Sequence, residues 1–321
     1  MRRRAVIPLL GGAAVAWQVA ARRAGAQLAV PVVGILTPSD ERSSPITPGM
    51  IARLAELGFE DGRNVALAIR SGARQAVPAM AADLARLRPA VMVVIDPAVV
   101  PAVRDAMPAT PIVSLTGDPV TAGFAQSLAR PGGLITGVAV IGEDLGAKRL
   151  EILAEILPHP ARVLFLRDPA APISPAAIRA AAPALGITLR DAEVAGPEDI
   201  ERVLGDARAS GLGGIGVLNS PLFFVQRHRI IALAAAARLP TIFHWVEIAH
   251  DGALLAYGVS LAETSRLLAG QVARILGGER PADIPVEQPT RIALAVNLRV
   301  ARALGLAIPP ALLARADDVI E

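Results

Sequence analysis

The chain has 321 residues, 53% of them hydrophobic and 19% charged, which suits two domains of ordinary size and excludes a disordered chain. It has no cysteine, so disulfide bonds, thiolate metal sites and cysteine nucleophiles are excluded. The formal net charge of +3 arises entirely from the first 26 residues, so the rest of the chain gives no support to nucleic-acid binding.

Residues 1–26 have the pattern of an export signal. Arginines at 2–4 precede an apolar stretch, and a small-residue Ala-Gly-Ala site stands at 24–26. The basic start and the arginines at 22–23 indicate the twin-arginine route, with an uncleaved membrane anchor as the alternative. This segment holds five of the 32 basic residues and no acidic one, so the remainder has 27 basic and 29 acidic residues. We predict a periplasmic protein.

Short apolar, β-branched runs alternate with helical patterns along the rest of the chain. Eleven runs predict strands, at 30–36, 64–70, 91–95, 111–115, 134–140, 162–167, 187–194, 214–219, 241–243, 253–257 and 291–296. Several are apolar throughout, as expected for parallel strands that are covered on both faces. Apolar residues recur on one face of 144–157 and of 261–276, which predicts helices there. The repetition predicts an α/β fold with doubly wound parallel sheets.

Eleven strands favour two sheets over one, and the pattern divides near residue 140. The first five predicted strands form one set, and the strands within 162–257 form another. The last predicted strand and helix, 291–305, fit either set. No Gly/Ser-rich linker marks a boundary, so we expect short crossings between two lobes.

Five predicted strands end in a polar residue followed by proline. The pairs are Thr37-Pro38, Asp96-Pro97, Asp118-Pro119, Asp168-Pro169 and Ser220-Pro221. Such residues cap helices, each for about 1 kcal/mol, and proline is tolerated in the first turn. Capping alone explains any single pair. However, all five lie at the carboxyl ends of strands, where open α/β sheets bind ligands and helix N-termini attract anions. Together they predict a ligand crevice lined from both lobes.

The stretch "TGDPVTAGFAQSLARPGG", residues 116–133, leaves two roles open for Asp118. The carboxylate either contacts a ligand or only caps the helix predicted behind it. Gly132-Gly133 is expected to turn the chain into the next strand.

Motifs for catalysis give no positive signal. Gly211, Gly213 and Gly216 have dinucleotide-motif spacing, but they follow a helical pattern and lead into a strand, which is the reverse of the required order. No Walker A sequence and no G-x-S-x-G elbow is present. Asp96, Asp118 and Asp168 follow three different predicted strands, but no nucleophile, metal set or cofactor motif accompanies them. We expect no cofactor and no enzymatic activity.

Residues His244, Glu247 and His250 lack the spacing of a helical zinc pair, so we expect no metal site. A structural cluster or the lining of a binding crevice fits them better. Trp245 and Tyr257 follow or lie in predicted strands and suit either the core or ligand stacking.

The chain resembles the periplasmic substrate-binding proteins of ABC transporters, in the tryptophan/tyrosine-type group. The residues that carry this resemblance are "MRRR…LLGGAA", "ELGFEDGRNVAL", "PIVSLTGDPVTAGFAQSLARPGGLITGV", "GAKRLEILAEILP", "RILGGERPADIPVEQPT" and "LAVNLRVARALGLAIPPALLARADDVIE". They cover most of the chain.

The resemblance implies two hinged lobes of the type I periplasmic-binding-protein kind. It divides the chain into an N-terminal lobe, 28–139 plus 258–321, and a C-terminal lobe, 140–257. It implies a monomer that delivers a small polar ligand, such as an amino acid, to an ABC permease and its ATPase. Its ligand-binding positions are Thr37, Asp96, Pro97, Ala98, Thr116, Asp118, Asp168, Asn219, Trp245 and Tyr257. An enzyme on the same scaffold and a periplasmic sensor domain are the alternatives.

Overall fold

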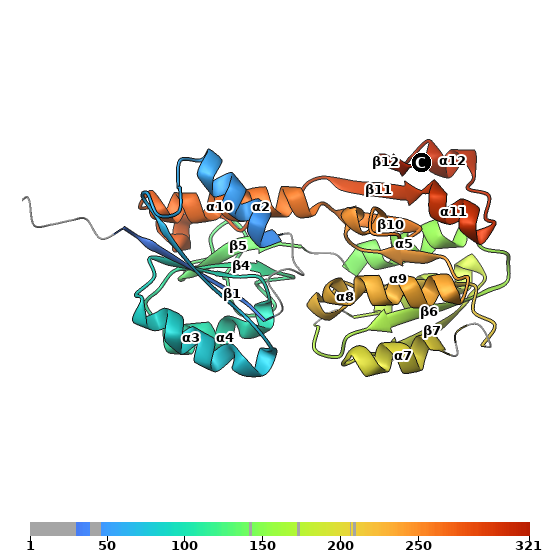
Figure 1. Cartoon of the computed structure of the whole chain (residues 1–321), viewed down its shortest axis with the longest axis horizontal. Coiled ribbons are helices and arrows are strands. Elements are labelled where there is room, and N and C mark those ends of the chain that lie inside the picture. Colours follow the sequence, from blue (N-terminus) through green and yellow to red (C-terminus); the bar gives the residue numbers. More distant parts are fainter. Residues whose placement is uncertain (1–29, 39–45, 141–142, 172–173, 206, 208–209) are drawn as a thin grey trace, which may run out of the picture.

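The computed structural model describes residues 30–321 except 39–45, 141–142, 172–173, 206 and 208–209. The predicted signal peptide therefore lies outside the described residues. The described chain forms two lobes, each a sheet with helices on both faces (Figure 1). This confirms the predicted α/β fold with two parallel-sheet lobes.

The first sheet has five parallel strands in the order β2-β1-β3-β4-β5. Its strands are β1 (Val32–Thr37), β2 (Ala66–Ser71), β3 (Val91–Val94), β4 (Ile112–Thr116) and β5 (Ile135–Ala139). Its helices are α2 (Ile46–Glu56), α3 (Val77–Arg86) and α4 (Val100–Ala106), with 3-10 turns η2 (Arg74–Ala76) and η3 (Pro97–Val99). The central strand β3 is apolar throughout and every one of its residues is buried, as expected where both faces of a sheet are covered. The edge strand β2 ends in Arg70 and Ser71 and is only partly buried.

The second sheet has seven strands in the order β12-β11-β10-β9-β8-β6-β7. The strands are β6 (Ala161–Arg167), β7 (Ile187–Glu193), β8 (Gly214–Val217), β9 (Thr241–Phe243), β10 (Leu255–Val259), β11 (Ile292–Asn297) and β12 (Asp318–Ile320). The remaining helices of the described chain are α5 (Glu143–Ala154), α6 (Ala176–Ala181), α7 (Pro197–Gly205), α8 (Pro221–Val225), α9 (Arg227–Ala236), α10 (Leu261–Leu276), α11 (Leu298–Leu304) and α12 (Pro310–Leu313). The 3-10 turns are η4 (Pro183–Leu185), η5 (Val246–Ala249) and η6 (Pro281–Asp283). Only the β10–β11 pair is antiparallel among the pairs of this described sheet.

The C-terminal part of the chain is shared between the lobes, which differs from the expected assignment of all of 258–321 to the first. Helix α10 packs against α2 and the first sheet, and η6 lies beside β5. Strand β11 instead pairs with β10, so β11, α11, α12 and β12 belong with the second sheet. The physical reason is edge pairing: β11 buries Ala295 and Val296 completely against the edge of β10 that would otherwise be open.

Each of the eleven predicted strands overlaps a strand of the structure, and the helix predicted over 261–276 has those bounds. The three-residue strand β12 was not predicted, because a run that short and that polar has no clear period. In the part of the chain that the structure describes, no helix has the length and apolarity needed to cross a membrane.

Candidate functional site

The carboxyl edges of the two parallel sheets lie where the chain crosses between lobes (Figure 1). The carboxyl end of β5 leads to α5 in the second lobe, and the carboxyl end of β10 leads through Ser260 to α10 in the first. Because β11 is antiparallel to β10, it enters the second sheet from this same edge. In doubly wound sheets this edge is where ligands bind.

On the first lobe, Asp96 is committed to internal contacts. The residue is 4% exposed, and its side chain accepts a hydrogen bond from the Ala98 backbone N–H at 2.9 Å, which caps η3. Its other oxygen pairs with Arg74 Nη2 at 2.6 Å. Beside it, Pro97 is half-buried and Ala98 is exposed. The negative charge at this strand end is therefore already compensated within the lobe.

Asp118, just after the end of β4, caps the chain that follows it. The side chain is exposed, and its oxygens accept hydrogen bonds from the Val120 N–H at 2.9 Å, from the Thr121 N–H at 3.3 Å and from the Thr121 hydroxyl at 2.6 Å. The Thr121 hydroxyl, followed by these backbone N–H groups, lowers the pKa of Asp118. The expected helix does not form, because the chain after Asp118 makes turns. Asp118 thus caps a turn, and its carboxylate stays ionised.

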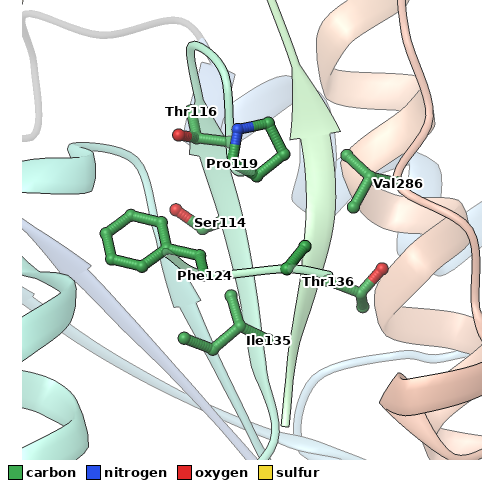
Figure 2. Close-up of a pocket in the computed structure, with 8 residues that line it drawn as sticks. Ser114, Thr116, Pro119, Phe124, Ile135, Thr136 and Val286 are labelled. Carbon is green, nitrogen blue, oxygen red and sulfur yellow. The ribbon is translucent and has the colours of Figure 1, made fainter. Parts of the chain in front are cut away.

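The loop after Asp118 folds back over the end of β4 and β5 and encloses a narrow pocket (Figure 2). The pocket does not admit a water-sized sphere. The lining residues are Ser114, Thr116, Pro119, Phe124, Ala125, Ile135, Thr136 and Val286. Because no water-sized sphere fits, the pocket is packing space and not a ligand site in this arrangement. Figure 2 shows the Phe124 ring beside Ser114 and Ile135.

On the second lobe, Asp168 ties two strand ends together. It is 5% exposed and accepts hydrogen bonds from the Ala170 N–H at 2.8 Å and the Ser220 hydroxyl at 2.5 Å. Ser220 in turn accepts the Leu222 N–H at 3.0 Å and caps α8. Turns, and not the expected helix, come after Asp168, and α8 has five residues. The strand-end polar residues of both lobes therefore cap short turns more often than helices, and they offer no long helix dipole to an anion.

Three strand-end side chains keep unused polar groups. Thr37 ends β1, Thr116 ends β4 and Asn219 lies just after β8. Within the described part of the chain, none of these three side chains makes a hydrogen bond. Their polar atoms are not fully buried, so each can still be reached from solvent. Thr37 and Thr116 are 3% and 7% exposed, and Asn219 is half-buried. These groups are available to a ligand at the edges of both sheets.

The two aromatic candidates differ in exposure. Trp245 follows β9, is 5% exposed and packs edge-on against His244, with ring centroids 4.9 Å apart. Tyr257 lies in β10 and is half-buried. In this arrangement Trp245 is part of the core of the second lobe, and ligand stacking by its ring would require the surrounding turn to move.

Sequence reasoning missed the buried cation behind this turn. Arg149 on α5 is 2% exposed, and its Nη1 donates to His244 Nδ1 at 3.1 Å and to the Tyr257 carbonyl at 3.3 Å. No carboxylate among the described residues forms an ion pair with it. Desolvation lowers the pKa of Arg149 to about 10. One signal was available in the sequence. Arg149 stands three, four and seven residues before apolar positions of the predicted helix, so it lies on the same face as the residues that are expected to be buried.

The contact with Arg149 also fixes the state of His244. Because the guanidinium only donates, His244 Nδ1 must accept, so the ring is neutral with its proton on Nε2. Burial, and then the charge of Arg149, lower the pKa of His244 well below its usual value. His250 points elsewhere and its Nε2 lies 2.6 Å from Asp318. The described residues contain no group of side chains placed to hold a metal ion.

Comparisons with known proteins agree with this architecture. A conserved domain protein from Vibrio cholerae is 24% identical, covers 90% of this chain and 99% of its own, and superposes with a TM-score of 0.78. A Streptococcus pneumonia ABC domain in complex with L-Trp is 21% identical, with 90% and 99% coverage and a TM-score of 0.80. An Agrobacterium vitis ABC transporter solute-binding protein bound with α-D-tagatopyranose is 13% identical, with 89% and 99% coverage and a TM-score of 0.60. No curated protein matches the chain.

These similarities define the class of the fold: two lobes of the type I periplasmic-binding-protein kind. Residues 29–320 match the family described as ABC transporter substrate binding protein. The chain belongs to this family, and its role is that of a solute-binding receptor with an ABC permease as its partner. Proteins of this family are binding proteins and usually work outside the cytoplasm.

Proposed function

We propose that this receptor binds a small polar ligand, such as an amino acid, between the carboxyl edges of its two lobes. The observation that carries the proposal is the set of unused polar groups of Thr37, Thr116 and Asn219, which lie at these edges. The buried Asp96 and Asp168 beside them are committed to capping. Ligand that bridges both edges favours the closed arrangement of the lobes. The L-Trp complex of the Streptococcus pneumonia relative supports an amino acid, and the tagatose complex keeps sugars in the test.

The full proposed site is the set of ten positions that the family resemblance implies. Thr37, Thr116 and Asn219 supply hydroxyl and amide groups, and the ionised Asp118 accepts an N–H donor of the ligand. Tyr257 and Trp245 supply aromatic surface, with Asp96, Pro97, Ala98 and Asp168 shaping the turns.

The proposed biological setting is that of the family. The signal peptide would direct export to the periplasm by the twin-arginine route, and the mature monomer would deliver its ligand to a permease that an ATPase powers. The receptor would release its ligand chemically unchanged, because the candidate site among the described residues holds no nucleophile paired with a general base.

A thermal-shift screen of the mature chain tests the binding proposal. The panel contains L-tryptophan, L-tyrosine, other amino acids, oligopeptides, D-tagatose, other sugars and nucleosides. A true ligand present at a hundred times its Kd is expected to stabilise the protein by about 2.7 kcal/mol through mass action. Chromatography of the stabilising compound after incubation is the control: conversion to a product would overturn the receptor proposal in favour of an enzyme.

Asp118→Ala is expected to weaken binding of the compound found in this screen at least tenfold, or by about 1.4 kcal/mol. The reason is that the variant removes an exposed, ionised acceptor at the carboxyl edge. Isothermal titration calorimetry measures the change. Asp61→Ala is the matched control, because Asp61 is an exposed carboxylate of the same lobe that accepts the Leu67 N–H at 2.8 Å. Unchanged affinity with a lowered melting temperature would assign Asp118 to capping alone.

A further inference from the structure

A carboxylate of the second lobe holds the start of a helix that packs on the first lobe. Glu247 lies in η5, which packs against β10 and β11. Its Oε1 accepts hydrogen bonds from the Ser260 hydroxyl at 2.7 Å and from the Leu261 N–H at 2.8 Å, with the Ala262 N–H at 3.4 Å. These groups form the N-terminus of α10, whose body packs against α2 and the first sheet. Glu247 therefore joins the two lobes directly.

The contact of Glu247 with Ser260 lies at the point where the chain crosses from β10 to α10. Ser260 is the single residue between β10 and α10, so any rotation of one lobe against the other at this crossing changes the backbone there. The Ser260 hydroxyl donates to Glu247 and also accepts from the Ala262 N–H at 3.1 Å. A carboxylate at the start of a sixteen-residue helix is further favoured by the helix dipole. Glu247 thus fixes the geometry of this crossing.

The return crossing is attached to the same helix turn. Glu263 Oε1, in the first turn of α10, accepts the Thr290 N–H at 3.2 Å, and Thr290 lies just before β11. Glu247 and Glu263 each leave their second oxygen, Oε2, buried without a hydrogen-bond partner in the described part of the chain. At each of these two crossings, one carboxylate oxygen makes the hydrogen bonds given above and the other has no partner among the described residues.

The turn that carries Glu247 also carries the aromatic side of the proposed site. Trp245 stands two residues before Glu247, and its neighbour His244 is held by the buried Arg149 of α5. The turn 244–247 is consequently fixed at one end to the second lobe and at the other to the N-terminus of α10. Trp245 and the Glu247 contact with α10 are therefore separated by two residues of one turn.

We propose that Glu247 is a positioning residue that couples the Trp245 side of the binding site to the crossing at Ser260. It touches no ligand and acts by setting the range of lobe arrangements that the ligand-free chain samples. The part that concerns Trp245 rests on the proposed function, whereas control of the crossing rests only on the hydrogen bonds of Glu247 with the start of α10.

Distances between spin labels on the two lobes test this coupling. The chain has no cysteine, so Arg86→Cys on α3 and Glu198→Cys on α7 give two unique labelling positions on exposed helix residues. Glu247→Ala is expected to widen the distribution of interlobe distances at least twofold in the absence of any ligand, as measured by pulsed electron resonance. Glu247→Gln keeps an oxygen acceptor and is expected to restore the original width.

Asp199→Ala is the matched control, since Asp199 accepts the Ala195 N–H at 3.0 Å within the second lobe and should leave the width unchanged. If Glu247→Ala does not fold, Ser260→Ala removes one of the donors and should also widen the distribution. An unchanged width for the folded Glu247→Ala or, in its place, Ser260→Ala would overturn the proposal. Because no ligand is added, failure of the ligand screen would leave this result intact. An unchanged distance distribution would likewise leave the result of the ligand screen intact.

Discussion

The free energy of unfolding is expected to fall by about 1.4 kcal/mol per pH unit through His244 alone as the pH drops below 6.5. The folded chain holds this imidazole neutral, because burial and the charge of Arg149 lower its pKa well below the usual value. The unfolded chain binds a proton near pH 6.5, so acid favours unfolding until the pH reaches the lowered pKa of the folded state. Urea unfolding at a series of pH values measures the slope.

The slope of His244 is isolated by comparison with His244→Gln. A glutamine amide oxygen accepts from Arg149 in place of Nδ1 but does not titrate. The difference in unfolding free energy between parent and variant should therefore change with pH below 6.5, whereas His228→Gln, at an exposed position, should leave the parent curve unchanged. Parallel curves for the parent and His244→Gln would contradict a neutral, buried His244.

Gly137→Ala is expected to cost at least about 3 kcal/mol of folding free energy, which combines backbone strain with overlap in a packed core. Gly137 in β5 has φ +146°, and a Cβ atom there would lie 2.0 Å from the Ser114 carbonyl oxygen. The overlap is with backbone, so a side-chain rotation cannot relieve it. The position also matters for the crossing, because the Gly137 carbonyl accepts the Glu287 N–H at 3.0 Å.

The matched control for this variant is Gly133→Ala. Gly133 lies four residues earlier and is exposed, and a Cβ atom added there would have no heavy atom within 4 Å. Its urea midpoint should stay close to that of the parent, while the midpoint of Gly137→Ala falls with an unchanged m-value. Equal midpoints for the two variants would show that β5 can shift away from β4 at little cost.

Local chemistry explains why much of the fold was predictable. Runs such as 91–95 are β-branched and apolar, so they signal buried parallel strands without knowledge of their partners. The capping role of Asp96, Asp118, Asp168 and Ser220 was also predictable, because capping depends on the residue type and its immediate neighbours. In the structure each of these side chains accepts the N–H of the residue two positions later. The element that each cap begins was not predictable, since a cap that starts a helix and one that starts a turn use the same first hydrogen bond.

The candidate site was predictable only as a set of strand ends. The sequence places Thr37, Thr116 and Asn219 after apolar runs, and the edge of a parallel sheet brings such positions to one side. Which of them keep unused polar groups depends on neighbours distant in the chain. Asp96, for instance, is committed to Arg74, and Asp168 is committed to Ser220, 52 residues away.

The sequence by itself determined the two-lobed α/β class, the strand positions and the family, because these depend on residue patterns a few positions long. The tertiary structure decided that β11 pairs antiparallel with β10, that Arg149 meets His244 across 95 residues, and that Glu247 holds the start of α10. Each of these contacts joins two separate segments of the chain. The residue pattern of either segment alone would allow it to pack against more than one partner. Only the packing of the whole chain selects one partner, and with it the geometry of the crossings between the lobes.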